Sequence, residues 1–125
     1  MIHLDTSFLI LALLQGSPQD ATLREWLRNG SPLGMSTIAW AEFLCGPVES
    51  HHVALAECIV SRRFSFEGED ATLTAQLFNQ SGRRRGSLTD CMIAATAVRH
   101  KATLATENPS DFRRFEPMGL TVVVT

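Results

Sequence analysis

The sequence contains few cysteines, and their arrangement resembles neither a metal site nor a redox site. Cys45, Cys58 and Cys91 are odd in number and contain no C-x-x-C spacing. Each lies in an apolar pattern typical of a helix, so we predict three buried free thiols in a protein of a reducing compartment.

Long apolar runs are also missing. No stretch approaches the roughly 18 apolar residues that a membrane span requires. The apolar start of the chain lacks the basic segment and the small-residue cleavage pattern of a signal peptide, and Asp5 precedes its longest apolar run. These absences argue against a membrane span and a signal peptide. We therefore expect a cytoplasmic protein without a membrane partner.

Positive charge is scarce, and lysine almost absent. The formal net charge is −2, and of the eleven basic residues only Lys101 is a lysine. This balance argues against nucleic-acid binding by bulk electrostatics, although an acidic metal site in a nuclease would itself lower the total. The ten arginines favour bidentate contacts with phosphate or carboxylate groups.

Short apolar segments alternate with helical patterns along all 125 residues, a length that suits one domain, 1–125. We expect strands at 1–4, 33–35, 102–106 and 120–124, and an extended connector at 64–66. The expected helices are 8–14, 17–29, 37–45, 50–63, 69–80 and 89–98, with one further helical turn at 112–115. This alternation predicts the α/β class, as a three-layer α/β/α sandwich on a mainly parallel central sheet.

Asp5 is expected where the first strand ends and the first helix begins. In open α/β folds, ligands bind at the carboxyl edge of the sheet, where such a residue lies. Asp-Thr-Ser is also good helix-starting chemistry, so an N-cap role for Asp5 is an equal alternative from its position alone.

Two later acids have the same ambiguity. Glu42 shares a helix face with Ile38 and Cys45, where a carboxylate either meets a cation or reaches water at the rim of the core. Asp90 begins the buried stripe of the most regular helix, or it is simply a first-turn acid favoured by the helix dipole. The basic run Arg83, Arg84 and Arg85 leads directly into Asp90, either as a solvated loop or as a contact for substrate phosphates.

Together the three acids form a pattern that each lacks alone. If the first strand is central, Asp5, Glu42 and Asp90 can converge at its carboxyl end. Three carboxylates that close could not all stay ionised without a cation. Oxygen ligands without histidine or cysteine suit Mg²⁺ or Mn²⁺ rather than Zn²⁺.

At these residues the sequence resembles the PIN-domain family, and most closely the VapC-type toxin ribonucleases. The matching segments appear in the family order and cover nearly the whole chain: Leu4-Asp5-Thr6-Ser7, Ser36-Thr37-Ile38 through Ala41–Gly46, Asp90–Ala95, and Leu104–Asn108 with Asp111-Phe112. A receiver domain would need paired acids after the first strand and a late lysine beyond a strand. A haloacid dehalogenase-type phosphatase would need an acid at Ser7.

The resemblance implies metal-dependent hydrolysis of RNA phosphodiesters by the toxin of a VapBC-type toxin–antitoxin pair. By this analogy Asp5, Glu42 and Asp90 would hold Mg²⁺ or Mn²⁺. Thr6, Ser7, Thr106 and Asn108 would support the site, and Arg83, Arg84 and Arg85 would contact RNA. The expected partners are the RNA substrate, a small antitoxin protein and a second copy of the chain. A PIN-like RNA-binding or regulatory module without activity is the alternative.

The chain departs from the family pattern at the fourth acid. Many members have an aspartate two residues after the threonine that corresponds to Thr106, whereas this sequence has Asn108. We expect Asp111 to supply the carboxylate instead, unless Asp111 only caps a turn that begins at Phe112. Occupancy of a second metal position depends on which of the two applies.

Overall fold

The computed structural model describes residues 1–125 and is built on a five-stranded sheet in which every neighbouring pair is parallel. The first strand lies at its centre, as expected, with Ile2 opposite Leu33 on one side and Thr103 on the other. The order is β3-β2-β1-β4-β5, formed by β1 (Ile2–Leu4), β2 (Leu33–Ser36), β3 (Arg62–Phe64), β4 (Thr103–Ala105) and β5 (Thr121–Val123).

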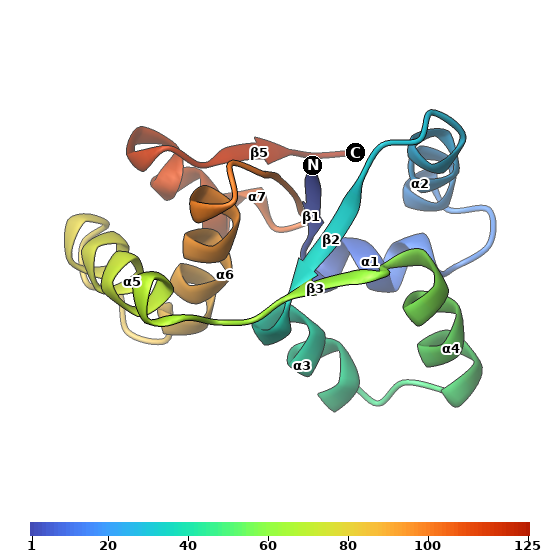
Figure 1. Cartoon of the computed structure of the whole chain (residues 1–125), viewed down its shortest axis with the longest axis horizontal. Helices are drawn as coiled ribbons and strands as arrows, with labels where there is room; N and C mark the ends of the chain where they lie inside the picture. Colours follow the sequence, from blue (N-terminus) through green and yellow to red (C-terminus); the bar gives the residue numbers. More distant parts are fainter.

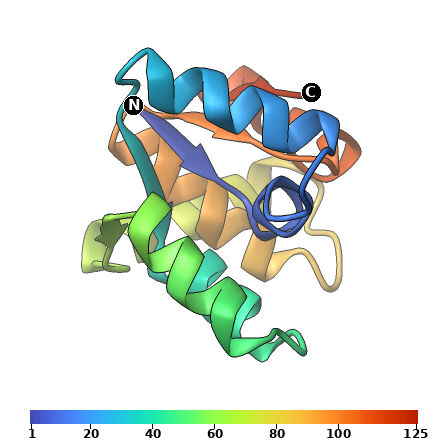
Figure 2. The ribbon, with the colours of Figure 1, turned by 90° about the vertical axis from the view of Figure 1, so that its right-hand side faces the viewer.

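Helices cover both faces of this sheet, which confirms the predicted three-layer sandwich. In Figure 1, α5, α6 and α7 lie on one side of the strands and α1, α2 and α4 on the other. Figure 2 shows α2 and α4 in front of the sheet and α6 behind it. The helices are α1 (Thr6–Ala12), α2 (Pro18–Arg28), α3 (Thr37–Cys45), α4 (Ser50–Ile59), α5 (Gly68–Gln80), α6 (Leu88–Arg99), α7 (Pro109–Phe112) and the 3₁₀ helix η1 (Arg113–Met118).

The strand order reverses direction between β1 and β4. From β1 the chain proceeds outward through β2 to the edge strand β3, then crosses to the opposite side of β1 and continues through β4 to β5. The carboxyl ends of β1 and β4 therefore flank the crevice where an α/β sheet places its ligands.

Polar caps and buried apolar side chains fix the helices around this crevice. The Ser36 hydroxyl at the end of β2 accepts a hydrogen bond of 3.0 Å from the Ala39 N–H, so strand and helix α3 join without a loop. Phe8 and Leu9 of α1 and Phe43 of α3 are almost completely buried. Burying each such side chain stabilises the fold by roughly 1.5–3 kcal/mol, so α1 and α3 are held firmly against the core.

The prediction was wrong between residues 60 and 66. Helix α4 ends at Ile59 rather than Arg63, and the edge strand β3 takes up residues 62–64. Its pairing with β2 depends on Gly34, where a Cβ would lie 2.6 Å from the Phe64 ring. A three-residue edge strand with two exposed arginines has no apolar alternation, so its pattern resembled a helix end.

The prediction of three buried thiols was correct only for Cys91. Cys45 and Cys58 are free and exposed. Helix α4 fully buries only Ala56, and Cys45 is the last residue of α3. A helical apolar pattern does not show how much of each helix the neighbouring elements cover.

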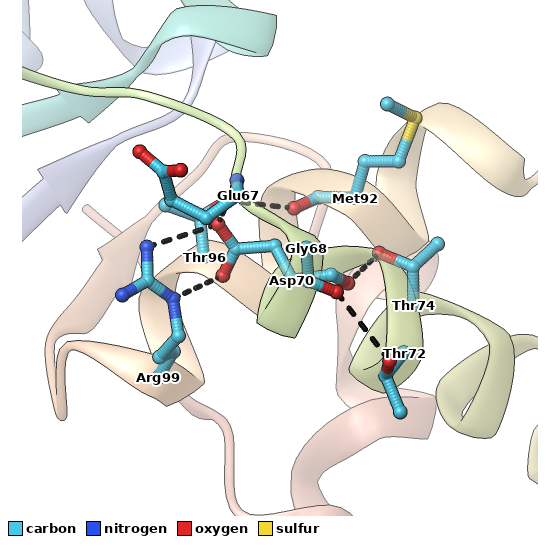
Figure 3. A network of polar contacts seen from close by, with 8 residues as sticks. All are labelled: Glu67, Gly68, Asp70, Thr72, Thr74, Met92, Thr96 and Arg99. Carbon is cyan, nitrogen blue, oxygen red and sulfur yellow. Dashed lines mark hydrogen bonds and ion pairs between the residues drawn. The ribbon is translucent and has the colours of Figure 1, made fainter.

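Helices α5 and α6 are joined by an ion pair that the sequence pattern did not indicate. Arg99 donates to both carboxylate oxygens of Asp70, whose side chain is completely buried. The same carboxylate accepts a 2.8 Å hydrogen bond from the Glu67 N–H at the start of α5 (Figure 3).

No helix of the chain has both the length and the apolar character to cross a membrane.

Candidate active site

Asp5 lies directly after β1, in extended backbone, with a side chain only slightly exposed. It occupies the N-cap position of α1 but makes no capping hydrogen bond. Its Oδ2 atom instead accepts hydrogen bonds of 2.8 Å from the Ser7 and Thr106 hydroxyls. This arrangement fixes the carboxylate and leaves Oδ1 without a protein donor, so the N-cap alternative does not describe its role.

The same two hydroxyls connect the ends of β1 and β4. Ser7 accepts a 3.0 Å hydrogen bond from the Glu107 N–H, and Thr106 accepts one of the same length from the Asn108 N–H. Thr6 bonds elsewhere, donating to the Ala39 carbonyl at 2.7 Å and thereby linking α1 to α3. Residues 106–108 are thus held against the start of α1.

The predicted acids surround one cavity of about 270 Å³, called here the acidic pocket. Its carboxyl groups come from four different elements or their ends: Asp5 after β1, Glu42 on α3, Asp90 on α6 and Asp111 on α7. The complete lining is Asp5, Thr6, Ser7, Ile10, Glu42, Asp90, Asn108, Asp111 and Phe112.

The backbone shows where the two candidates for the fourth ligand lie. Helix α7 begins at Pro109, so Asp111 lies within it and does not cap a turn at Phe112. Asn108 also lines the pocket, whereas the Glu107 carboxylate turns away to accept a 2.7 Å hydrogen bond from Gln19. Asn108 and Asp111, the two candidates for the fourth ligand, therefore both line the acidic pocket.

Burial and neighbouring negative charge raise the pKa of two carboxyl groups of the acidic pocket. Burial, and then the negative charges of Asp111 and Asp5, raise the pKa of Asp90 to about 6, despite the opposing effect of Arg114 and Arg84. Burial, followed by the charges of Asp5 and Asp90, also raises the pKa of Glu42. Both groups therefore hold their protons more tightly than an isolated carboxyl group does, as clustered acids without a cation should.

The donor set fits a hard divalent cation. The pocket offers carboxylate, amide and hydroxyl oxygens and no histidine or cysteine, the ligand chemistry of Mg²⁺ and Mn²⁺. No three acidic, histidine or cysteine side chains are arranged to hold a metal ion as they stand. The Glu42 side chain is exposed and that of Asp90 is 30% exposed, so both have room to change rotamer.

A second cavity, of about 230 Å³, adjoins the first and shares Asp90 and Asp111 with it. This arginine pocket is also lined by Arg84, Arg85, Gly86, Ser87 and Arg114, and by no hydrophobic residue. Arg83 is not part of it, because its guanidinium hydrogen-bonds to Asn79 and lies over the Phe78 ring.

Sequence reasoning missed Arg114. The residue lies outside the basic run, and its only sequence signal is a position three residues after Asp111, which places the two side chains near each other on a helical turn. Its Nη2 atom is 3.8 Å from Asp90 Oδ2.

The raised pKa of Asp90 predicts a stability difference without metal. Because the folded state binds this proton more tightly than the unfolded state, stability falls as the pH rises from 3.8 to about 6 and then levels off. Asp90→Asn removes this loss of stability, because the asparagine side chain does not ionise. In EDTA at pH 7.5 it should raise the free energy of unfolding by about 1–2 kcal/mol, after allowance for solvent screening, and at pH 4 by almost nothing.

Urea unfolding at both pH values measures this difference, and Glu25→Gln, a change at an exposed site on α2, is the control. An Asp90→Asn variant that is less stable than the wild type at pH 7.5 would show that Asp90 is a structural acid.

Comparison with known proteins identifies the family. The model of the PIN domain matches residues 2–116. The chain belongs to the PIN domain family. A search of curated protein sequences finds no match.

Solved structures of toxin–antitoxin systems have the same PIN fold. A chain of the Rickettsia felis VapBC2 complex with promoter DNA is 21% identical, with a TM-score of 0.80 and coverage of 100% of this chain and 99% of that one. DNA-bound VapBC of Salmonella typhimurium is 22% identical, with a TM-score of 0.77 and coverage of 98% and 96%. Mycobacterium tuberculosis VapC20, described as a sarcin–ricin loop cleaving toxin, is 17% identical, with a TM-score of 0.67 and coverage of 97% of both chains. At these identities the likeness establishes the fold.

Proposed function

We propose that this PIN domain is a metal-dependent endoribonuclease, the toxin of a VapBC-type pair. One observation carries the proposal: Asp5, Glu42, Asp90 and Asp111 line one pocket at the reversal point of the sheet, beside a pocket lined by arginines. An acidic site for a cation next to a basic site for phosphate is an arrangement that suits metal-assisted hydrolysis of a phosphodiester. The description of VapC20, which has the same fold, as a sarcin–ricin loop cleaving toxin supports RNA as the substrate in this proposal.

The acidic residues of the pocket would hold the cation from different elements of the fold. Asp5, held through Oδ2 by two hydroxyl donors, would be a cation ligand in a fixed orientation. Glu42 on α3 and Asp90 on α6 would complete the set of ligands. Bound Mg²⁺ or Mn²⁺ supplies Lewis acidity, activating water and stabilising the charge that develops on phosphate oxygens. No serine, histidine or cysteine nucleophile is required.

Incubation of the purified protein with RNA and with single-stranded DNA of the same base sequence tests the proposal. We expect cleavage of the RNA with Mg²⁺ or Mn²⁺ and none with EDTA. A regulatory module without activity would leave RNA intact, and its melting temperature would not respond to Mn²⁺. Cleavage of the DNA alone would show that the substrate is DNA and not RNA.

The comparison of Asp111 with Asn108 decides the identity of the fourth ligand. A carboxylate holds a divalent cation far more strongly than a neutral amide oxygen. Asp111→Asn should therefore reduce the rate of RNA cleavage at saturating Mn²⁺ by about tenfold to a hundredfold. Asn108→Ala should reduce it less, and Asn108→Asp should increase it.

Melting curves of the three variants exclude unfolding as the cause of any loss. If Asp111→Asn cleaves normally while Asn108→Ala is inactive, the fourth position belongs to Asn108. The site would then depend on one tightly held cation.

An antitoxin partner is part of the proposal, because several solved neighbours are toxin–antitoxin complexes. A candidate surface is the apolar groove formed by two cavities of about 180 and 440 Å³ that share Leu13 and His52. Ile10, Leu14, Leu27 and Leu55 line it and are each about half exposed. Apolar side chains gathered in this way suit a protein partner, and we assign them to the antitoxin.

A further inference from the structure

Arg114 lies in an unusual environment for a charged residue. Its side chain is only 14% exposed, and its guanidinium lies over the Phe115 ring with 4.8 Å between the carbon Cζ and the ring centroid. The Nε and Nη2 atoms are buried and have no hydrogen-bond partner. The contact from Nη2 to Asp90 Oδ2, at 3.8 Å, is too long for a hydrogen bond.

Arg99 shows what a structural arginine looks like in the same protein. Its Nε and Nη2 atoms both donate to the Asp70 carboxylate, so its buried donors are satisfied. Leaving the corresponding donors of Arg114 unpaired is costly, since a buried charged donor without a partner loses its hydration for no compensating bond. The Phe115 ring therefore positions this guanidinium, while its Nε and Nη2 atoms make no hydrogen bond within the protein.

The arginine pocket supplies the place for an anion. Arg114 lines it together with Arg84, Arg85 and Ser87, and no apolar side chain takes part. Tetrahedral phosphate oxygens match the planar fork of a guanidinium, and a desolvated fork binds them most strongly. The pocket opens beside Asp90 and Asp111, which it shares with the acidic pocket.

We propose that Arg114 binds a backbone phosphate of the substrate and holds it beside Asp90 and Asp111. Arg84 and Arg85 contribute further positive charge to the same pocket, and Arg83 does not. The inference rests on the proposed function for the identity of the ligand as RNA. A purely structural Arg114, which only offsets the charge of Asp90, is the competing role.

Binding of a fluorescein-labelled single-stranded RNA in EDTA, measured by anisotropy over a series of NaCl concentrations, separates the two roles. Arg114→Gln should raise the Kd about tenfold or more, as expected for loss of a charge-assisted hydrogen bond. It should also reduce the steepness of log K against log salt by about one. Arg113→Gln removes the same charge at the exposed neighbouring residue and should change both quantities little.

Arg114→Lys keeps the charge without the fork, so its Kd should fall between those of the wild type and Arg114→Gln. If melting curves show that Arg114→Gln does not fold, the comparison of Arg114→Lys with the wild type provides the test instead. An Arg114→Gln protein with the Kd and salt dependence of Arg113→Gln would overturn the proposal, and so would a change confined to the Mn²⁺ dependence of cleavage. A wild type that does not bind RNA in EDTA would overturn it as well.

Cleavage by the wild type with Mn²⁺ is measured separately. A wild type that binds RNA through Arg114 but never cleaves it refutes the nuclease and upholds the phosphate site.

Discussion

Asp5→Asn is expected to reduce RNA cleavage by more than about a hundredfold while leaving the fold intact, because it removes a cation ligand and not a packing contact. The Asn side chain keeps an oxygen that can accept from Ser7 and Thr106, so the connection between β1 and β4 survives. Glu42→Gln and Asp90→Asn should cause losses of the same order. Initial rates at saturating Mn²⁺ provide the measurement.

Glu25→Gln is the matched control, since it neutralises an exposed carboxylate on α2, away from the pocket, and should cleave normally. Melting curves with and without Mn²⁺ add an independent readout. The wild type should gain stability from Mn²⁺, and the three variants should gain less. Normal cleavage by Asp5→Asn would show that the acidic pocket takes no part in cleavage.

The central part of the site could be predicted because it depends on short-range patterns. An acid directly after a buried strand lies at the carboxyl edge of the sheet whatever the rest of the chain does, and Asp5 does so. Asp90 begins a stripe of buried residues on α6, which fixes the face on which it lies. Convergence then followed from the position of β1 at the centre of the sheet.

The arginine pocket could not be predicted in the same way. Adjacent residues of a loop point in different directions, so the run Arg83–Arg85 does not show that Arg83 faces Asn79 while the next two line the cavity. Arg83 has a φ of 55°, a left-handed conformation that turns the chain at this point. The place of Arg114 near Asp90 depends on the packing of α7 against α6, a contact that the sequence pattern does not show.

The edge of the fold was harder to predict than its centre. Central strands are buried on both faces and leave a continuous apolar signal, whereas β3 pairs on one side only and exposes Arg62 and Arg63. The ion pair of Asp70 with Arg99 was missed for a related reason. Asp70 also has the sequence pattern of an ordinary first-turn acid, and only the packing of α5 against α6 shows its partner.

Arg99→Ala should destabilise the protein by about 3 kcal/mol at pH 7, because it leaves the buried Asp70 carboxylate without a cation. Burial acts to raise the pKa of Asp70, but hydrogen bonds from Arg99 and the Glu67 N–H outweigh it, and the pKa is lowered from 3.8. The stability that the pair contributes in the wild type is therefore present above pH 3.8 and lost as the pH falls through the lowered pKa.

The variant should behave in the opposite way with pH. Without Arg99, burial favours the protonated carboxyl group, so the variant loses stability as the pH rises above 3.8. The difference from the wild type should be largest near pH 7 and less than about half as large at pH 4, as measured by urea unfolding. Arg28→Ala, at an exposed arginine in the last turn of α2, should cost little at either pH.

A second substitution identifies the unpaired charge as the cause. Asp70→Asn in the Arg99→Ala background should recover part of the lost stability at pH 7, since it removes the buried charge and keeps an oxygen that can accept from the Glu67 N–H. If the double variant is less stable than Arg99→Ala at pH 7, the loss arises from packing of the arginine side chain and not from the orphaned carboxylate. The double variant is more stable than Arg99→Ala if the unpaired charge causes the loss, and less stable if lost packing causes it. The comparison therefore shows whether charge or packing connects α5 to α6.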